Sequence, residues 1–532
     1  MSAGPLDYLI IGAGPAGLQL AQELGAAGYD YLVLESGNVP GAFFTRFPRH
    51  RQLISSNKPH TGSDDPEFNL RMDWNSILSP DGELLFTRYS SRYFPPADDL
   101  LRYLGDYAKR FALRIDYETA ATRVSRASDD DGDQSFTVTD SRDRTHHARR
   151  LIVATGMRKP YIPPIPGIEL ADHYATVSVD PGEFTDQRVL IIGKANSALE
   201  TADNLVETAA VIHVAGPGST HLAWRTHYVG HLRAVNNNFL DTYQLKSQNA
   251  ILDGTVRSIE RGDDGMFTVR FAFSRANELV KELRYHRVIA CTGFRFDADI
   301  FDDSCRPALI HKDRFPRLTS AYEAEGVPGL YVAGTLTQVR DFKRGTSGFI
   351  HGFRYGARAL RKILQMRHHN VPWPSVAVPG TAADTTAAIL ARVNRTSGLY
   401  QQFGTLADVV LRPAGGDARY LEEVPVDLVR DGGLDELSDG ADVLVITLEY
   451  GPDHDKVDPF DVTVSRVAQN DAERAFDSAY LHPVVRLYQD GNLVATHHVA
   501  ENLENEWDKP AHRDPLAAFL AAHAPAGAAA AR

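Results

Sequence analysis

Cysteine is scarce in this chain, which has only Cys291 and Cys305 among its 532 residues. The two are spaced neither as a CxxC motif nor as a zinc-binding set, which argues against a disulfide scaffold, a structural metal and a vicinal dithiol site. We therefore expect two unpaired, buried thiols and no metal site.

Long apolar runs are missing as well. No run reaches the roughly 18 residues of a membrane span, and the N-terminus lacks the charged and apolar regions of a secretory signal. We expect no membrane partner and a cytoplasmic location.

Dense clusters of basic residues are also absent, and the net charge is −13. Such a chain offers no face that follows a phosphate backbone, so a nucleic-acid partner is not expected. Hydrophobic residues make up 43% and charged residues 23% of the sequence, which is typical of a globular protein, and the length suits three or four domain-sized cores. Small molecules are the expected partners.

The N-terminal segment has the pattern of a buried strand, a glycine turn and a helix. Gly12, Gly14 and Gly17 form the GxGxxG motif, whose glycines allow a tight turn, close approach to a pyrophosphate and close packing of helix on strand. A second strand, 31–35, ends in Glu35 at about the 20-residue separation expected of an acid that binds a ribose. This stretch predicts an FAD cradle.

A second strand, turn and helix of the same kind begins at residue 188. The cofactor-binding positions predicted there are Gly193, Ala195, Asn196 and Ser197. The strand that follows ends without an acid to hold a ribose 2′-hydroxyl, which favours NADPH over NADH. Ser219 and Arg225 are the nearest candidates for the 2′-phosphate, although an exposed surface arginine explains Arg225 equally well.

Three other apolar strands end in glycine, a pattern that suits closure around a flavin. The strand-end positions assigned to the cofactor are Thr155, Gly156, Gly293 and Gly334. We expect the strand 288–294 to belong to the first domain. The helix that begins near Gly348 and Phe349 would direct its N-terminus at the pyrophosphate or the flavin edge.

The predicted fold class is α/β, with an FAD-binding Rossmann-like domain, an inserted NADPH-binding Rossmann-like domain and a C-terminal α+β domain. The expected ranges are 1–160 and 286–370 for the FAD-binding domain, 161–285 for the NADPH-binding domain, 385–523 for the C-terminal domain and 524–532 for a disordered tail. The C-terminal domain has no motif that indicates chemistry. We expect it to cover the active site or to form the face of a homodimer.

These patterns resemble known flavoproteins. The two cradles, with the strings 154–156 and 292–294, resemble the flavin-containing monooxygenases over about residues 5–365. Longer strings, at 48–58, 226–230, 241–247 and 348–355, look like the FAD-dependent oxidoreductase domain-containing flavoproteins of the endoplasmic reticulum, which are associated with glycoprotein quality control. The monooxygenase signature FxGxxxHxxx before the second cradle is absent. Without a secretory or retention signal, we expect a small-molecule enzyme of the same build.

The monooxygenase resemblance implies that NADPH reduces FAD, that the reduced flavin forms a C4a-hydroperoxide with O2, and that oxygen passes to a substrate atom. Ser55 to Lys58 resembles the flavin-facing loop of these enzymes. Asn57 is the expected catalytic residue, donating a hydrogen bond to the oxygen adduct, and Lys58 adds a positive field. An asparagine that satisfies its own turn is the alternative. Arg51 is assigned to the FAD pyrophosphate.

We expect N-hydroxylation of an amino acid, with aspartate among the candidates, or of another small amine, because amino-acid N-hydroxylases are among the bacterial enzymes that resemble this chain. The predicted substrate-binding residues are Arg49, His50, His227, Arg340 and Lys343. The cationic side chains would pair with a substrate carboxylate. Solvated loop charges are the alternative for them, and packing against Tyr228 is the alternative for His227.

Two other functions stay open. The first is an NADPH-dependent flavin reductase or dehydrogenase with an external acceptor, which the missing signature favours. The second is a flavin-bound interaction protein whose C-terminal domain recruits a partner.

Overall fold

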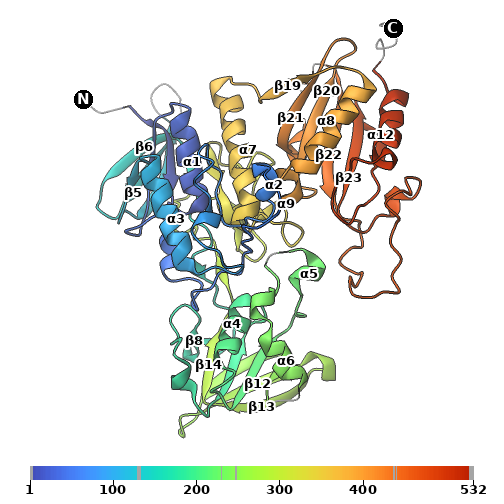
Figure 1. Ribbon diagram of the computed structural model, residues 1–532. Coiled ribbons are helices and arrows are strands. Elements are labelled where there is room, and N and C mark those ends of the chain that lie inside the picture. Colours follow the sequence, from blue (N-terminus) through green and yellow to red (C-terminus); the bar gives the residue numbers. More distant parts are fainter. Residues whose placement is uncertain are drawn as a thin grey trace.

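The computed structural model describes residues 4–128, 134–228, 230–245, 248–434, 438 and 440–525. Three sheets organise the chain (Figure 1): one near the N-terminus, one in the middle of the sequence and one near the C-terminus. Most of the predicted tail, residues 526–532, lies outside the described residues. None of the helices within the described ranges has the length and apolar character needed to span a bilayer.

The first sheet has the strand order β3-β2-β1-β6-β5-β4, with β18 beside β6. Its five parallel strands are β1 (Leu6–Ile11), β2 (Tyr31–Leu34), β3 (Ile115–Asp116), β6 (Thr145–Val153) and β18 (Leu330–Val332). The antiparallel strands β4 (Ala121–Ser128) and β5 (Gln134–Asp140) extend it, and α3 (Ala97–Arg110) packs beside it. Parallel strands covered by helices bury both faces of the sheet, which explains why these strands are apolar runs.

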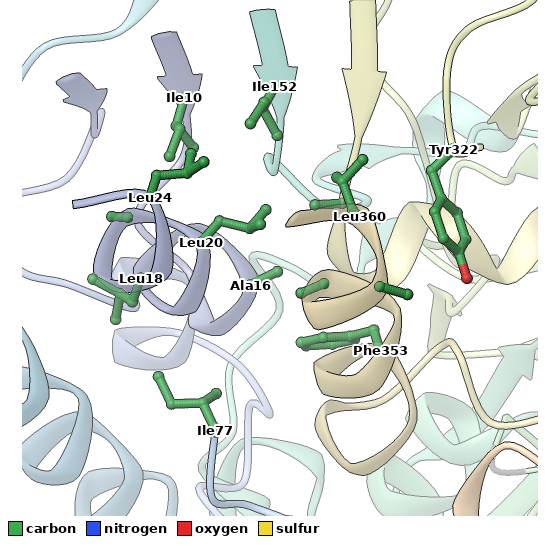
Figure 2. Packing of buried hydrophobic residues seen from close by; sticks show 14 of the residues in the cluster. Ile10, Ala16, Leu18, Leu20, Leu24, Ile77, Ile152, Tyr322, Phe353 and Leu360 are labelled. Atoms are coloured by element: carbon green, nitrogen blue, oxygen red, sulfur yellow. The ribbon is translucent and has the colours of Figure 1, made fainter. Parts of the chain in front are cut away.

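Helices α1 (Pro15–Ala26) and α7 (Ile350–His369) lie side by side against this sheet (Figure 2). Leu20 and Leu360 are fully buried at their contact, and each such side chain contributes about 2 kcal/mol. The helices run in the same direction, because the Gln19 side chain donates to the Arg354 carbonyl (2.8 Å) and Glu23 pairs with Arg361 (3.4 Å). Their N-termini therefore point to the same region of the molecule.

The second sheet has the order β13-β12-β11-β10-β9-β14-β8. Its strands are β8 (Asp172–His173), β9 (Arg188–Ile192), β10 (Val211–Gly216), β11 (Ala250–Arg261), β12 (Phe267–Phe273), β13 (Leu279–Tyr285) and β14 (Arg287–Ala290). Helices α4 (Asn196–Leu205), α5 (Ala223–Thr226) and α6 (Asn238–Gln244) belong to the same domain.

Strand β14 corrects one expected boundary. It pairs in parallel with β9, so Val288 lies opposite Leu190 and the strand belongs to the inserted domain rather than to the first. A buried apolar strand carries no sign of which sheet it joins, which is why the sequence placed the boundary too early. The chain enters and leaves the inserted domain through β7 (Lys159–Pro160) and β15 (Phe294–Arg295), which pair with each other.

The third sheet is antiparallel, with the order β19-β21-β20-β22-β23-β24. Its strands are β19 (Ser375–Val378), β20 (Leu406–Arg412), β21 (Ala418–Pro425), β22 (Asp442–Glu449), β23 (His482–Gln489) and β24 (Asn492–His498). Helices α8 (Ala382–Arg395) and α12 (Pro510–Ala522) cover one face (Figure 1). Val410 faces that layer, whereas Val409 and Leu411 face the core of the first domain. The sheet therefore shares its other face with the first domain.

Candidate flavin and nicotinamide site

The first cradle joins β1 to α1. Gly12 has a φ of 106°, and a Cβ there would lie 2.7 Å from the Ala154 carbonyl oxygen. A Cβ on Gly17 would lie 2.0 Å from the Gly12 carbonyl oxygen, so α1 approaches the turn too closely for a side chain. Gly14 has no atom within 4 Å of its ideal Cβ position. The turn is therefore closed by protein on one side and open at the helix N-terminus, which fits a dinucleotide pyrophosphate.

Glu35 follows β2 and lies beside this turn. The carboxylate accepts hydrogen bonds from the backbone N–H groups of Ala13 (2.8 Å) and Gly37 (2.6 Å) and is almost fully buried. These bonds hold the acid at the carboxyl end of the parallel strands, where a ribose of FAD would bind. Thr155 and Gly156 follow β6 at the same edge, and Gly156 has no atom within 4 Å of its ideal Cβ position.

The second cradle repeats the close approach of the first. A Cβ on Gly193 would lie 2.2 Å from the Cys291 carbonyl oxygen, and its φ is 132°. Ala195 is exposed at the start of α4, and Ser197 lies in its first turn. The helix N-terminus has no capping side chain, so its backbone N–H groups can bind a phosphate.

Asn196 has a different contact from the one expected. Its amide nitrogen donates to the His231 carbonyl (2.8 Å), and its amide oxygen accepts from the backbone N–H of Arg233 (3.0 Å). The side chain thus fixes the loop 230–236 and is not available for the cofactor.

Ser219 and Arg225, the two residues predicted to bind the 2′-phosphate, lie in different surroundings. Ser219 is exposed on the turn after β10. Arg225 donates to the carbonyls of Asp455 (2.9 Å) and Lys456 (3.1 Å) in the third domain. Arg225 was predicted to bind the cofactor, and in the structure its hydrogen bonds instead join two domains that are far apart in sequence.

The remaining predicted cofactor glycines lie in two places, at the first cradle and at the crossing between the domains. Gly334 has a φ of 77° and lies against α1, since its ideal Cβ position is 2.9 Å from the Ala16 Cβ. Gly348 and Phe349 precede α7, whose N-terminus has no side-chain cap. These positions lie with the first cradle. Gly293, with a φ of 86°, lies instead beside the crossing into the second domain.

Asn57 is almost fully buried, with 1% of its surface exposed. Its amide nitrogen donates to the carbonyls of Ser90 (2.7 Å) and Arg92 (3.1 Å), whereas its Oδ1 atom is buried without a hydrogen-bond partner. The expected role as a donor is therefore corrected: the free atom is an acceptor. Lys58 is exposed to solvent.

The basic residues before Asn57 hold the loop in place. Arg49 donates to the Val177 carbonyl (2.6 Å) and so joins the first domain to the second. Burial and the neighbouring Arg49 lower the pKa of His50 to about 4, so its imidazole is neutral at pH 7. Arg51 pairs with Asp98 rather than facing a pyrophosphate, which corrects its predicted role.

The predicted substrate residues beyond this loop do not gather around Asn57. His227 stacks on Tyr450 of the third domain, with ring centres 4.1 Å apart. Arg340 pairs with Asp427 of the same domain, and Lys343 is exposed. The sequence could not show these contacts, because their partners come from a domain whose position it does not predict.

The structure brings other side chains to Asn57. The rings of Trp74 and His351 stack at 4.0 Å, and the Arg233 guanidinium lies 4.8 Å from the centre of the Trp74 ring. His351 is fully buried, and neither of its ring nitrogens has a hydrogen-bond partner. The only sequence signal for this group was the aromatic and basic composition of the loop 36–96 and the position of His351 at the start of α7.

Two open dinucleotide cradles, one in a domain inserted into the other, define a two-dinucleotide-binding flavoprotein. The open space at Gly14 and Gly156 fits a bound FAD. The chain belongs to the pyridine nucleotide-disulphide oxidoreductase family, which matches residues 9–334. This membership confirms the predicted fold class and the predicted cofactors, FAD and NADPH.

Known proteins of the same build include the FAD-dependent oxidoreductase domain-containing protein 2 of Mus musculus, which is 40% identical over 97% of this chain and 83% of its own length. A flavin-containing monooxygenase of Arabidopsis thaliana, FMO GS-OX-like 3, is 28% identical over 58% of this chain and 68% of its own length. Among solved structures, the bacillithiol disulfide reductase Bdr of Staphylococcus aureus has a TM-score of 0.53 and 20% identity, covering 69% of this chain and 100% of its own. The similarity to the Mus musculus protein confirms the resemblance to FAD-dependent oxidoreductase domain-containing flavoproteins.

Proposed function

We propose that this oxidoreductase is an FAD- and NADPH-dependent monooxygenase that oxygenates a small molecule. The preferred reaction is N-hydroxylation of an amino acid, with aspartate among the candidates, or of another small amine. The observation that carries the proposal is the buried, unpartnered Oδ1 atom of Asn57, in the loop that resembles the flavin-facing loop of monooxygenases.

When bound, FAD would accept hydride from NADPH and activate O2. The residues of the chain orient the substrate. The Ser90 and Arg92 carbonyls fix the Asn57 amide, so its Oδ1 atom has one direction in which to accept a hydrogen bond. A substrate N–H group directed at this atom would have its nitrogen held in place.

Burial around Asn57 also excludes water. Its neighbours Ser55 and Ser56 are buried, and Ser55 donates to Asn75 beneath the loop. A dry environment favours oxygen transfer, because release of hydrogen peroxide to water competes with it. The similarity to the Arabidopsis flavin-containing monooxygenase supports the same reaction class.

The second candidate is a flavin reductase with an external acceptor, which the missing monooxygenase signature favours. A version that uses its own dithiol is disfavoured, because Cys291 and Cys305 are both buried and burial raises the pKa of Cys291 to about 12. The third candidate is a flavin-bound interaction protein, favoured by the exposed Phe460, Val462 and Phe476 of the third domain.

For the nicotinamide cofactor, Lys194 replaces Arg225 as the proposed contact to the 2′-phosphate. The Lys194 amine donates to the Gly218 carbonyl (3.2 Å) and pairs with Asp253, so it lies at the turn after β10. We expect Lys194→Ala to reduce the preference for NADPH over NADH, measured as the ratio of the two kcat/KM values, by about tenfold. An unchanged ratio would remove Lys194 from the phosphate site.

Turnover in the presence of NADPH, O2 and a panel of amino acids and amines tests the proposed reaction. The measurement is the yield of hydroxylated product against that of hydrogen peroxide. Asn57→Ala should leave the rate of flavin reduction by NADPH within about twofold and divert most turnover to peroxide. Asn204→Ala, which removes an asparagine on the surface of α4, is the matched control.

Each alternative has its own result in this assay. Peroxide without product from every compound would favour the reductase. No reduction of the flavin by NADPH or NADH would favour the interaction protein.

A further inference from the structure

Four residues from three segments of the chain lie near the loop of Asn57, and we call them the Arg233 cluster: Trp74, Tyr93, Arg233 and His351. Two backbone hydrogen bonds attach the cluster to the loop of Asn57: the Trp74 N–H donates to the Ser56 carbonyl (3.1 Å), and the Asn57 N–H donates to the Tyr93 carbonyl (2.8 Å). The Trp74 ring contacts the His351 ring and the Arg233 guanidinium, so the first domain and the inserted domain meet at this tryptophan.

Arg233 is a cation without an anion. No carboxylate of the described residues lies within salt-bridge distance of its guanidinium, whereas Arg392 elsewhere in the chain pairs with several acids. Burial lowers the pKa of Arg233, and the guanidinium still keeps its charge. A half-buried charge without a partner is costly, and a bound anion removes that cost.

A second guanidinium in the same place also lacks an acid. Arg354 is fully buried and donates to the carbonyls of Asp73 (2.9 Å), Ser76 (2.8 Å) and Leu70 (2.7 Å). These bonds fix the backbone on both sides of Trp74. Arg354 forms no ion pair among the described residues, and the nearby buried carboxylate of Asp73 accepts hydrogen bonds from Asn75 and Ser76 instead.

The other side of the cluster consists of neutral acceptors. His351 is fully buried, and burial with the nearby Arg354 and Arg233 holds its pKa well below the usual range. A neutral imidazole accepts a hydrogen bond at one ring nitrogen, and Asn57 offers its unpartnered Oδ1 atom. Neutral acceptors suit an N–H group and do not repel a nearby carboxylate.

We propose that the Arg233 cluster recognises the substrate and selects compounds that carry both a carboxylate and an amine, the first bound by Arg233 and the second held by Asn57 and His351. This inference rests on the proposed function and adds the residues that would bind the carboxylate and the amine of an amino-acid substrate. It also moves the carboxylate site away from Arg340 and Lys343.

The position of Arg233 links substrate recognition to the nicotinamide site. Asn196, at the start of α4 in the second cradle, accepts from the backbone N–H of Arg233 (3.0 Å) and from the side chain of Asn236 (3.3 Å). The inserted domain thus carries the carboxylate-binding group, while the first domain carries Asn57 and His351. The complete site requires both domains in their docked arrangement.

Equilibrium binding to the FAD-loaded enzyme, saturated with NADP+, tests the proposal without any oxygen chemistry. The probes are acetate, succinate and benzoate, with 1,4-diaminobutane as a cation of similar length to succinate, and the readouts are calorimetry and the flavin absorbance. We expect at least one acid to bind and the diamine not to bind. Arg233→Gln should weaken acid binding by about tenfold or more, and Arg233→Lys should weaken it less.

Arg261→Gln is the matched control, since Arg261 lies in the same domain over the ring of Phe267 (5.6 Å). Unchanged FAD content and melting temperature of the Arg233 variants establish that they fold. Absence of binding by all three acids, or equal binding by Arg233→Gln, would overturn the proposal. Weaker binding of NADP+ with unchanged acid binding would assign Arg233 to the cofactor and overturn it as well. If acids bind in a way that depends on Arg233 but the enzyme forms no oxygenated product, the proposed monooxygenase reaction is refuted and the carboxylate site at Arg233 stands.

Discussion

Gly14 illustrates how a single residue can lack protein neighbours and still be required. Its φ of −72° suits any residue, and nothing lies within 4 Å of its ideal Cβ position. Gly14→Val should therefore fold normally while the branched side chain occupies the space of the pyrophosphate. We expect the purified variant to keep its circular dichroism spectrum and to lose about nine tenths of its bound FAD, measured by flavin absorbance.

Gly12 provides the contrast for this experiment. Gly12→Ala places a Cβ 2.7 Å from a backbone oxygen at a φ of 106°, so it should lower stability as well as FAD content. Full retention of FAD by Gly14→Val would contradict the position of the cradle.

Single residues also show which contacts the sequence can predict and which it cannot. The cradle glycines and Glu35 were predictable because turn, helix and acid follow one another at fixed spacings. The contacts of Arg225, His227 and Arg340 were not predictable, because the partners, Asp455, Tyr450 and Asp427, lie in a domain with no recognisable motif. A positive charge in a loop does not show which acid or carbonyl it will meet.

Helix α7 connects two domains through buried charges. Arg358 on α7 pairs with Glu423 on β21, which is 1% exposed and also lies near Arg392 (3.5 Å). These guanidinium groups hold the pKa of Glu423 at about 2, although burial opposes them. The charged form is therefore the stable one at neutral pH.

Glu423→Gln leaves the partly buried Arg358 without its carboxylate, whereas Arg392 keeps Asp408. We expect a loss of about 3 kcal/mol in the free energy of unfolding, measured by chemical denaturation at pH 7. Glu325→Gln, which breaks the exposed pair with Arg317 (3.7 Å), should cost less than about 1 kcal/mol. Equal effects of the two changes would show that the buried pair does not hold α7 to the third domain.

The contact between α5 and the third domain should respond to pH. His227 stacks on Tyr450, lies near His454 and follows Arg225, whose bonds go to the same segment. Burial and the neighbouring His454 lower the pKa of His227 to about 4, below its ordinary value of about 6.5. The unfolded or undocked state therefore binds the proton more readily, and stability is lost as the pH falls from about 6.5 to 4.

Hydrogen exchange of residues 450–460 measures this change. We expect faster exchange at pH 5 than at pH 7, after correction for the intrinsic rate, and a smaller difference in His227→Gln. Identical pH dependence in the variant would assign the effect to other groups.

At the scale of the whole molecule, the two dinucleotide-binding domains were the most predictable feature. Each cradle is a local pattern, and the inserted order follows from their positions in the chain. The position of β14 and the shared core of the third domain were not predictable in this way, because an apolar strand such as Val409 to Leu411 fits equally well against any apolar face. The Arg233 cluster was missed for the same reason, since its members come from three distant segments.

The two attached domains should differ in whether they can be removed. The inserted domain enters and leaves through strands that pair Pro160 with Phe294, and its buried residues form clusters of their own. A short glycine linker in place of residues 162–292 should therefore leave a folded protein that binds FAD and has no affinity for NADPH.

The third domain differs, because Leu421 and Val424 share a core with Leu360 of α7. Ending the chain at residue 378 would expose that core and Arg358, so we expect aggregation and loss of FAD. Size-exclusion chromatography with flavin absorbance compares the two deletions, and a monomeric, yellow protein from the second one would show that the third domain is an independent attachment.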